Sequence, residues 1–189
     1  MSIIDIQCAD LLSQKVDAIV CPAHKHLIRG RGLSAQIFDR AGEPLEAECT
    51  KLPSCAVGEA RLTLAHNLPA RYIIHTVTPQ WSSGDQWGVQ ALVLLRCCYQ
   101  SALELALDQG LESIAFPALG AGTNRVPQCL SARIGLEVLE GHKREFRRLL
   151  VCLNNVSNQH EWEQAHAELL KRMAKQAQKE RRTSETLSS

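Results

Sequence analysis

Two spacing patterns of hydrophobic residues alternate along this chain. Short apolar runs bounded by turn residues are typical of buried strands, whereas apolar positions repeated every three or four residues are typical of helices. We expect strands within residues 2–7, 15–22, 58–69, 71–81, 113–117 and 147–155, and helices within 32–42, 43–52, 89–110, 127–140 and 160–182.

This alternation predicts an α/β fold, a three-layer α/β/α sandwich with a mixed, mainly parallel central sheet. We find no internal repeat and no linker, so residues 1–175 are expected to form one domain. The polar end, residues 176–189, is expected to be a disordered tail. In such sheets ligands bind where the carboxyl ends of the strands lead into loops.

Two of those expected loops are rich in glycine. Gly120 and Gly122 follow the strand at 113–117, and Gly30 and Gly32 precede the helix at 32–42. Glycine lets a ligand approach the main chain closely, and successive N–H groups in such a turn form a concave anion site. Neither loop matches a Walker A or a GxGxxG dinucleotide motif. The pair therefore predicts a clamp for a phosphate or diphosphate that does not depend on lysine.

Composition narrows the class of protein. Of 189 residues, 45% are hydrophobic and 22% charged, and the formal net charge of +1 gives no overall attraction to nucleic acid or membrane. No apolar stretch is long enough to span a bilayer, and the start of the chain lacks the positive region of a signal peptide, so we expect a cytoplasmic protein. Basic segments at 142–148 and 171–182 are interpreted as solvated surface, and nucleic-acid binding is the least favoured class because interleaved aromatics are missing.

Eight cysteines raise the question of disulfides or metal. No CxxC pair occurs and several cysteines fall inside apolar runs, so we expect reduced thiols packed as small hydrophobes. Cys21, His24 and His26 stand close in sequence and could hold a metal, but we favour a loop that merely contains them. We therefore expect no metal and no cofactor. His75 lies inside an apolar run and is interpreted as a hydrogen-bonded core histidine.

Several longer motifs carry a family resemblance. In order, they are "CADLLSQKVDAIVCPAH", "GRGLSAQIFDRAG", "CAVGEARLTLAHNLPARYIIHTVTPQW" and "SIAFPALGAGTNRVP". Over about residues 5–170 the chain resembles the macrodomain family, and within it the MacroD-like branch, whose members bind ADP-ribose.

The resemblance implies a ligand-binding set. Asp10 would accept a hydrogen bond from the adenine amino group, and the main chain at Leu11 would lie beside the ring. The amides of residues 32–34 would form one wall of the diphosphate site and those of 120–124 the other, while Asn154 or Asn155 would lie near the adenine. The full implied set is Asp10, Leu11, Ala23, His24, Gly30, Gly32, Leu33, Ser34, Gly120, Ala121, Gly122, Thr123, Asn124 and Asn154.

The chain departs from the family pattern at two positions that serve hydrolysis. Hydrolytic members carry Asn-Ala-Ala-Asn where this chain has Cys-Pro-Ala-His, so His24 stands at the second Asn. They carry Gly-Gly-Gly-Val-Asp where this chain has Gly-Arg-Gly-Leu-Ser, so Ser34 stands at the Asp that helps to activate water. We expect a module that binds ADP-ribose or ADP-ribosylated protein, with weak or absent hydrolysis. The alternatives are an ADP-ribosyl hydrolase or O-acetyl-ADP-ribose deacetylase with His24 and Ser34 in substitute catalytic roles, and a zinc-dependent relative.

Overall fold

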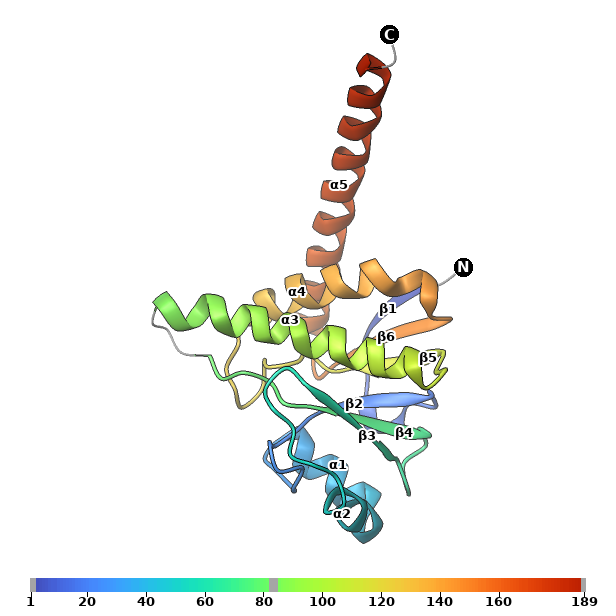
Figure 1. Cartoon of the computed structure of the whole chain (residues 1–189), viewed down its shortest axis with the longest axis vertical. Coiled ribbons are helices and arrows are strands. Elements are labelled where there is room, and N and C mark those ends of the chain that lie inside the picture. Colours follow the sequence, from blue (N-terminus) through green and yellow to red (C-terminus); the bar gives the residue numbers. More distant parts are fainter. Residues whose placement is uncertain (1–2, 82–84, 188–189) are drawn as a thin grey trace.

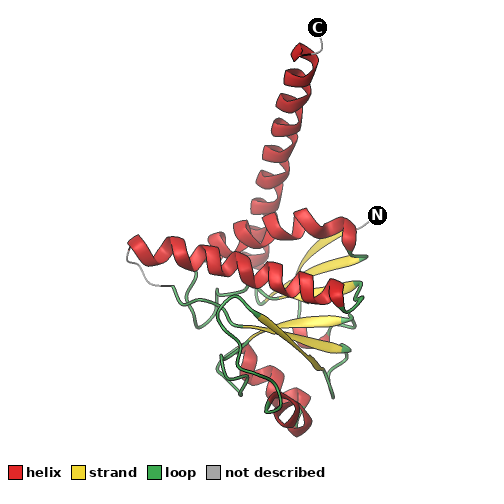
Figure 2. Cartoon of the chain, in the orientation of Figure 1, coloured by secondary structure: helices red, strands yellow, loops and turns green. Residues whose placement is uncertain are grey.

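The structure is a computed structural model that describes residues 3–81 and 85–187. Six strands form one sheet, and helices cover both of its faces (Figure 1, Figure 2). The strands are Ile3–Cys8 (β1), Ala18–Pro22 (β2), Ala60–Leu64 (β3), Tyr72–Thr76 (β4), Ser113–Phe116 (β5) and Arg148–Leu153 (β6). The helices are Leu33–Ala41 (α1), Glu43–Cys49 (α2), Asp85–Asp108 (α3), Gln128–His142 (α4) and Val156–Leu187 (α5), with short 3-10 turns at Leu11–Ser13 (η1) and Lys143–Glu145 (η2).

The strand order across the sheet is β1-β6-β5-β2-β4-β3. Every neighbouring pair is parallel except β3 and β4, which are antiparallel. This mixed, mainly parallel sheet between helices confirms the predicted fold class. The strands at both ends of the chain, β1 and β6, are paired over their whole length, a long-range contact that no local sequence pattern announces.

Two hydrophobic clusters fill the space on either side of the sheet. One joins the sheet to α1 and α2 through residues such as Ile37, Phe38 and Leu45. The other joins it to α3, α4 and α5 through residues such as Tyr99 and Trp162. Central strands are therefore buried on both faces, as the continuous apolar run of β5 requires.

The parallel arrangement sends several loops to one edge of the sheet. The carboxyl ends of β1, β2, β4, β5 and β6 all point the same way because these strands run parallel to one another. The loops that follow β2 and β5 leave neighbouring strands, and we call residues 23–32 the first glycine loop and residues 117–126 the second glycine loop. The fold thus gathers the expected ligand-binding segments at a single edge.

Residues 176–187, which belong to the expected disordered tail, are helical in the structure, whereas residues 188–189 lie outside the described residues. The structure continues α5 as far as Leu187, and from residue 170 onward the helix projects away from the domain (Figure 1). This segment is rich in Ala, Lys, Gln, Glu and Arg, which all favour a helix. The domain boundary at residue 175 stays a prediction. Among the described helices, none combines the length and apolarity needed to cross a membrane.

His75 lies inside the core, as expected from its apolar neighbours. It is fully buried on β4, and its Nε2 lies 2.8 Å from the Thr63 hydroxyl on β3. Burial lowers the pKa of His75 from about 6.5 to about 4, because the interior disfavours the charged ring.

This burial predicts an acid-dependent loss of stability. Between about pH 6.5 and pH 4 the unfolded chain takes up a proton at His75 that the native protein does not bind, so the free energy of unfolding falls as the pH falls. Nuclear magnetic resonance should show the His75 ring neutral at pH 5, and His75→Gln should flatten the pH dependence of urea unfolding in this range. A His75 midpoint near 6.5 would contradict the burial argument.

Candidate functional site

The two glycine loops lie against each other. They follow β2 and β5, which are paired in parallel with Ala18 opposite Ile114. A Cβ atom placed on Gly32 would come 3.6 Å from the Cγ2 atom of Thr123, which makes these two residues neighbours. The loops therefore form adjoining walls at the carboxyl edge of the sheet.

The end of the first glycine loop and the first turn of α1 present main-chain donors. Gly32 has φ +58°, a conformation that favours glycine, and it caps the start of α1. The first amides of a helix lack partners within the helix. Among the described residues, no protein acceptor reaches the amides of Gly32, Leu33 and Ser34. This wall can therefore donate hydrogen bonds to an anion next to the positive end of the helix dipole.

The Ser34 side chain braces this loop from inside. Its hydroxyl accepts a hydrogen bond from the Gly30 amide at 3.3 Å, and the side chain of Cys21 lies within hydrogen-bonding reach. Ser34 is only 2% exposed. The structure thus gives this hydroxyl a task in fixing the loop, and nothing in its surroundings supports the predicted catalytic role.

The second glycine loop is closed by its own main chain. The Val126 amide donates to the Gly120 carbonyl at 2.9 Å, and the Arg125 amide donates to the Gly122 carbonyl at 3.0 Å. Gly120 has φ +78°, and a Cβ atom there would lie only 2.8 Å from Val126. In this part of the described chain the amides of Gly120, Gly122 and Thr123 have no protein acceptor, while that of Ala121 donates weakly to Ala118 at 3.3 Å.

Asn124 fastens the second glycine loop to the segment after β4. Its side-chain amide donates to the carbonyl and the hydroxyl of Thr78, at 3.0 and 2.7 Å. Its main-chain carbonyl accepts from the Trp81 amide at 2.8 Å. Asn124 was predicted to contact a ligand, but these bonds engage the side-chain nitrogen in holding the loop.

A buried ring of hydrogen bonds fixes the start of the second glycine loop, and we call it the Leu119 clamp. The Leu119 amide donates to the Tyr99 hydroxyl at 3.1 Å, and the Ser131 hydroxyl donates to the Leu119 carbonyl at 2.7 Å. The Tyr99 hydroxyl lies 3.1 Å from the Ser131 oxygen and closes the ring as donor. Burial raises the pKa of Tyr99, so the phenol keeps its proton.

Gly135 makes room for the clamp. A Cβ atom at this position of α4 would lie 2.7 Å from the Tyr99 ring. Helix interiors disfavour glycine by roughly 1 kcal/mol relative to alanine, so this residue is explained by the aromatic ring that packs against it. Tyr99 also stacks on Phe116 at the end of β5, with ring centroids 5.5 Å apart.

Next to the glycine loops lies a groove of about 450 Å³ between the ends of β1 and β6 and the start of α1. It brings together four residues of the predicted set, Asp10, Leu11, Leu33 and Asn154. Leu33 belongs both to this groove and to the first turn of α1, so the groove continues into the glycine-loop walls. Cys8, Ala9, Gln36, Cys152 and Leu153 complete the lining.

The Asp10 carboxylate is held in place but not enclosed. It caps η1 by accepting the Leu12 amide on Oδ1 at 3.1 Å, while Oδ2 accepts from the Ser13 hydroxyl at 2.7 Å and from Arg40 at 2.9 Å. The side chain remains 45% exposed. The hydrogen bond from Ser13, followed by those from Arg40 and Leu12, lowers the pKa of Asp10 against the opposing effect of burial, so the group is a carboxylate at neutral pH.

The two candidate asparagines after β6 have separate positions. Asn154 lines the groove, and its side-chain oxygen accepts from Asn158 at 2.9 Å. Asn155 precedes α5, and its side-chain oxygen accepts the Asn158 amide at 2.8 Å, which is the geometry of a helix N-cap. Only Asn154 is available to the groove.

His24 lies on the surface of the first glycine loop. Its Nδ1 accepts the His26 amide at 3.1 Å, and a Cβ atom on Gly30 would lie 3.9 Å from the Cβ of His24. Ala23 is half-buried and donates its amide to Thr76 at 2.8 Å. Cys21 is fully buried, and burial raises its pKa to about 12.

These positions count against the zinc alternative. The described residues contain no grouping of three His, Cys, Asp or Glu side chains able to hold a metal ion. Cys21 is fully buried, whereas His24 and His26 are exposed on the surface of the loop.

Sequence reasoning missed two kinds of residue. The Leu119 clamp joins α3, α4 and the second glycine loop, and no local motif connects Tyr99 with Ser131. Cys8 and Cys152 enter the groove because β1 and β6 pair, with Gln7 opposite Cys152. Gln36 alone had a usable signal, since it lies one helical turn after Leu33.

Comparisons with known proteins agree with this geometry. The profile of a family described as Macro domain matches residues 20–135. A "Macro domain-containing protein" of Methanosarcina mazei is 39% identical over 152 residues, covering 78% of this chain and 80% of that protein. The "ADP-ribose glycohydrolase MACROD1" of Mus musculus is 38% identical over 154 residues, covering 79% of this chain. The matched part spans only 47% of the mouse enzyme.

Solved structures of macrodomains superpose on this chain. A macrodomain of Oceanobacillus iheyensis with ADP superposes with a TM-score of 0.81 at 28% identity, covering 87% of this chain and 90% of that one. A variant of the same macrodomain with ADPR has a TM-score of 0.80. A Trypanosoma brucei macrodomain in complex with ADP has a TM-score of 0.72 at 33% identity, covering 80% of this chain and 63% of that one.

The Leu119 clamp predicts a local effect of one hydroxyl group. Tyr99→Phe removes the acceptor of the Leu119 amide and should cost about 1 kcal/mol of stability. Beyond that global effect, hydrogen exchange at the amides of the second glycine loop should accelerate, because the loop loses its anchor. Thr63→Val, which removes a buried hydroxyl on β3, is the matched control. Equal exchange in the loop of both variants would show that the clamp is not needed there.

Proposed function

Because this chain belongs to the macrodomain family, we propose that it binds ADP-ribose, free or attached to protein, along the carboxyl edge of its sheet. The observation that carries the proposal is the contact between the two glycine loops, which places the unpaired amides of residues 32–34 beside those of 120, 122 and 123. A diphosphate between them would receive hydrogen bonds from both walls and lie at the N-terminus of α1. The superposed macrodomains of Oceanobacillus iheyensis hold ADP and ADPR, which supports this choice of ligand.

The groove beside the loops suits the adenosine half of the ligand. Its apolar lining from Leu11, Leu33 and Leu153 can cover a base, and Asp10 stands at its rim. A carboxylate offers about four acceptor positions, of which three are used by Leu12, Ser13 and Arg40. The remaining position can accept the amino group of adenine, whereas a keto-bearing base would place an oxygen against it.

The other end of the ligand would lie near Ala23 and His24. Position 24 is a histidine in this chain, where hydrolytic macrodomains carry an asparagine. Ser34, which stands in place of their aspartate, is buried under the loop. The diphosphate contacts use main-chain donors, so they do not need an asparagine side chain at position 24, and Ser34 serves them only by supporting the loop. We therefore propose that binding persists while hydrolysis is weak or absent.

This proposal predicts the effect of filling the open space at Gly122. A Cβ atom there meets nothing within 4 Å, so Gly122→Val should leave the thermal midpoint nearly unchanged. The added methyl groups would occupy the space that the diphosphate needs, so calorimetric affinity for ADP-ribose should fall by at least about tenfold, or 1.4 kcal/mol.

Gly141→Val on α4 is the control, because a Cβ atom there also meets open space. It should bind ADP-ribose like the wild type. Unchanged affinity in Gly122→Val, or no heat from the wild-type protein, would overturn the proposed site.

Turnover is the second candidate function, and the names of the MACROD1 relatives favour it. In this reading the chain releases ADP-ribose from protein or deacetylates O-acetyl-ADP-ribose. Of the two predicted catalytic residues, His24 is exposed beside Gly30 and Ser34 is enclosed. His24 would have to act as the base, but its Nδ1 already accepts the His26 amide, so a neutral ring carries its proton on Nε2. The loop would have to release Nδ1 before His24 could accept a proton from water.

An assay on ADP-ribosylated protein separates the two functions. We expect the wild-type chain to bind this substrate and to release little ADP-ribose, with the mouse relative as a positive control. Robust release that His24→Ala abolishes without weakening ADP-ribose binding would instead establish the second candidate. Ser34→Ala should loosen the first glycine loop and weaken binding, because it removes the acceptor of the Gly30 amide.

A further inference from the structure

The net charge of +1 is the sum of two oppositely charged parts of the chain. Residues 1–169 contain 15 Lys and Arg against 18 Asp and Glu, a net charge of −3. Residues 170–189 contain six Lys and Arg against two Glu, a net charge of +4. A charge asymmetry of this kind points to an anionic partner for one part of a protein.

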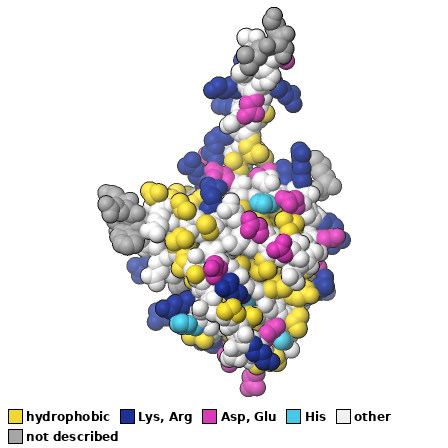
Figure 3. All heavy atoms as spheres, in the orientation of Figure 1, with side chains coloured by type: hydrophobic (Ala, Val, Ile, Leu, Met, Phe, Trp, Pro, Cys, Tyr) yellow, Lys and Arg dark blue, Asp and Glu magenta, His cyan; other side chains and the backbone are white. Residues whose placement is uncertain are grey.

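Within the positive part, residues 170–186 are an exposed stretch of α5, which we call the α5 extension. Leu169 is the last buried residue of α5, and every residue of the extension is exposed. At 1.5 Å per residue the extension is about 25 Å long. It stands clear of the domain, with Lys and Arg side chains along its length (Figure 1, Figure 3).

Cations gather on one side of the extension. Lys171, Lys175, Lys179 and Arg182 follow at intervals of four, four and three residues, which places them along one face of the helix. Like charges four residues apart destabilise an isolated helix. This row of cations therefore lowers the stability of the helix unless an anion binds to it.

The lysines of the extension have no ion pair within the described residues: none reaches Lys171, Lys175 or Lys179. Arg172 lies 3.9 Å from Glu137 on α4. By contrast, the domain pairs most of its arginines, including Arg29, Arg40, Arg61, Arg71, Arg96 and Arg148.

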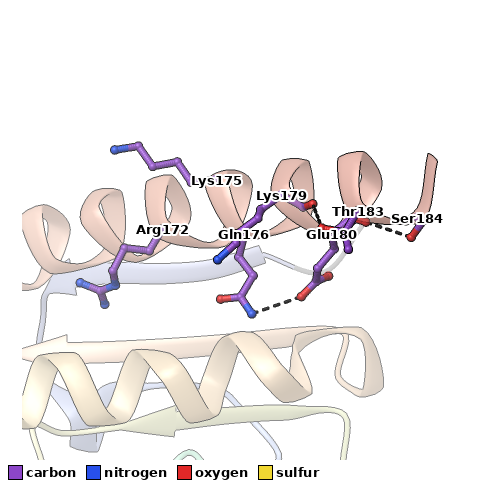
Figure 4. A pocket seen from close by; sticks show the side chains of 7 residues that line it. All are labelled: Arg172, Lys175, Gln176, Lys179, Glu180, Thr183 and Ser184. Atoms are coloured by element: carbon purple, nitrogen blue, oxygen red, sulfur yellow. Dashed lines mark hydrogen bonds between the residues drawn. The ribbon is translucent and has the colours of Figure 1, made fainter. Parts of the chain in front are cut away.

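The close-up in Figure 4 shows side chains of this helix between Arg172 and Ser184. The Gln176 side chain donates to Glu180 at 3.2 Å, so this carboxylate is occupied by an amide. All residues that line the hollow there come from α5, which makes it a helix surface and not a closed pocket for a small molecule.

We propose that the α5 extension binds the phosphate backbone of double-stranded nucleic acid. An unobstructed helix fits the major groove of DNA, and a row of cations on one face can neutralise successive phosphates. From the sequence alone, nucleic-acid binding is disfavoured by the overall charge and by the missing aromatic residues. The structure separates the charges in space, and aromatic stacking matters for single strands and not for duplex backbones.

Other anionic partners fit less well. A helix that lies on a membrane needs a broad face of large apolar residues, and the side opposite the cations offers only Leu170 and Met173 among alanines. Pairing of two extensions would bring two charges of +4 together.

The test is fluorescence anisotropy of the full chain with a labelled DNA duplex of arbitrary sequence, at low and moderate salt. The variant carries Lys171→Gln, Lys175→Gln and Lys179→Gln, which keeps helix propensity similar. The control carries Lys15→Gln, Lys51→Gln and Arg144→Gln, which removes the same charge from exposed positions of the domain. Wild-type binding should weaken with salt, with a log–log slope of about −3 to −5, since each neutralised phosphate contributes about 0.9.

The extension variant should lose at least about tenfold in affinity and flatten the slope by about 3, while the control stays within about twofold. Absence of binding at low salt, or equal loss in both variants, would overturn the proposal. So would binding to anionic vesicles with no binding to the duplex, or self-association that the extension variant abolishes with no binding to the duplex. Both variants should bind ADP-ribose like the wild type, so the outcome is independent of the proposed function.

Discussion

Parallel pairing of β2 with β5 is the constraint on which the rest of this structure depends. It makes the two glycine loops leave the sheet at the same edge, one strand spacing apart, and it sets Gly32 beside Thr123. Among the described residues, several amides of both loops have no protein acceptor. Two adjoining rows of main-chain donors next to a helix N-terminus are an arrangement suited to binding an anion.

Keeping those donors unpaired requires a firm support from behind. In the second glycine loop the support is the Leu119 clamp, whose polar atoms are all satisfied within the core. In the first it is the Ser34 hydroxyl under Gly30. The side chains that shape the site are therefore mostly hidden below it, and the surface that faces a ligand is largely main chain.

The fold could be predicted from the sequence because it depends on local patterns: the apolar runs indicated each strand, and the glycines after β2 and β5 indicated the loops. Asp10, Leu11, Leu33 and Asn154, which the family resemblance implied as ligand-binding residues, do share one groove. Contacts between segments that are distant in the sequence could not be predicted from local patterns. Nothing near Ser131 indicates that its hydroxyl meets Tyr99, and the burial of Ser34 became visible only when the loop was folded over it. Length and charge alone also did not show that α5 continues as an exposed helix.

The preference for main-chain donors has a consequence for how such a protein changes over time. Amide groups are the same whichever amino acid carries them, so a replacement at an exposed position such as 24 alters the chemistry beside the site without dismantling the cradle. A cradle built in this way can change the reactive groups around it while its own backbone stays the same.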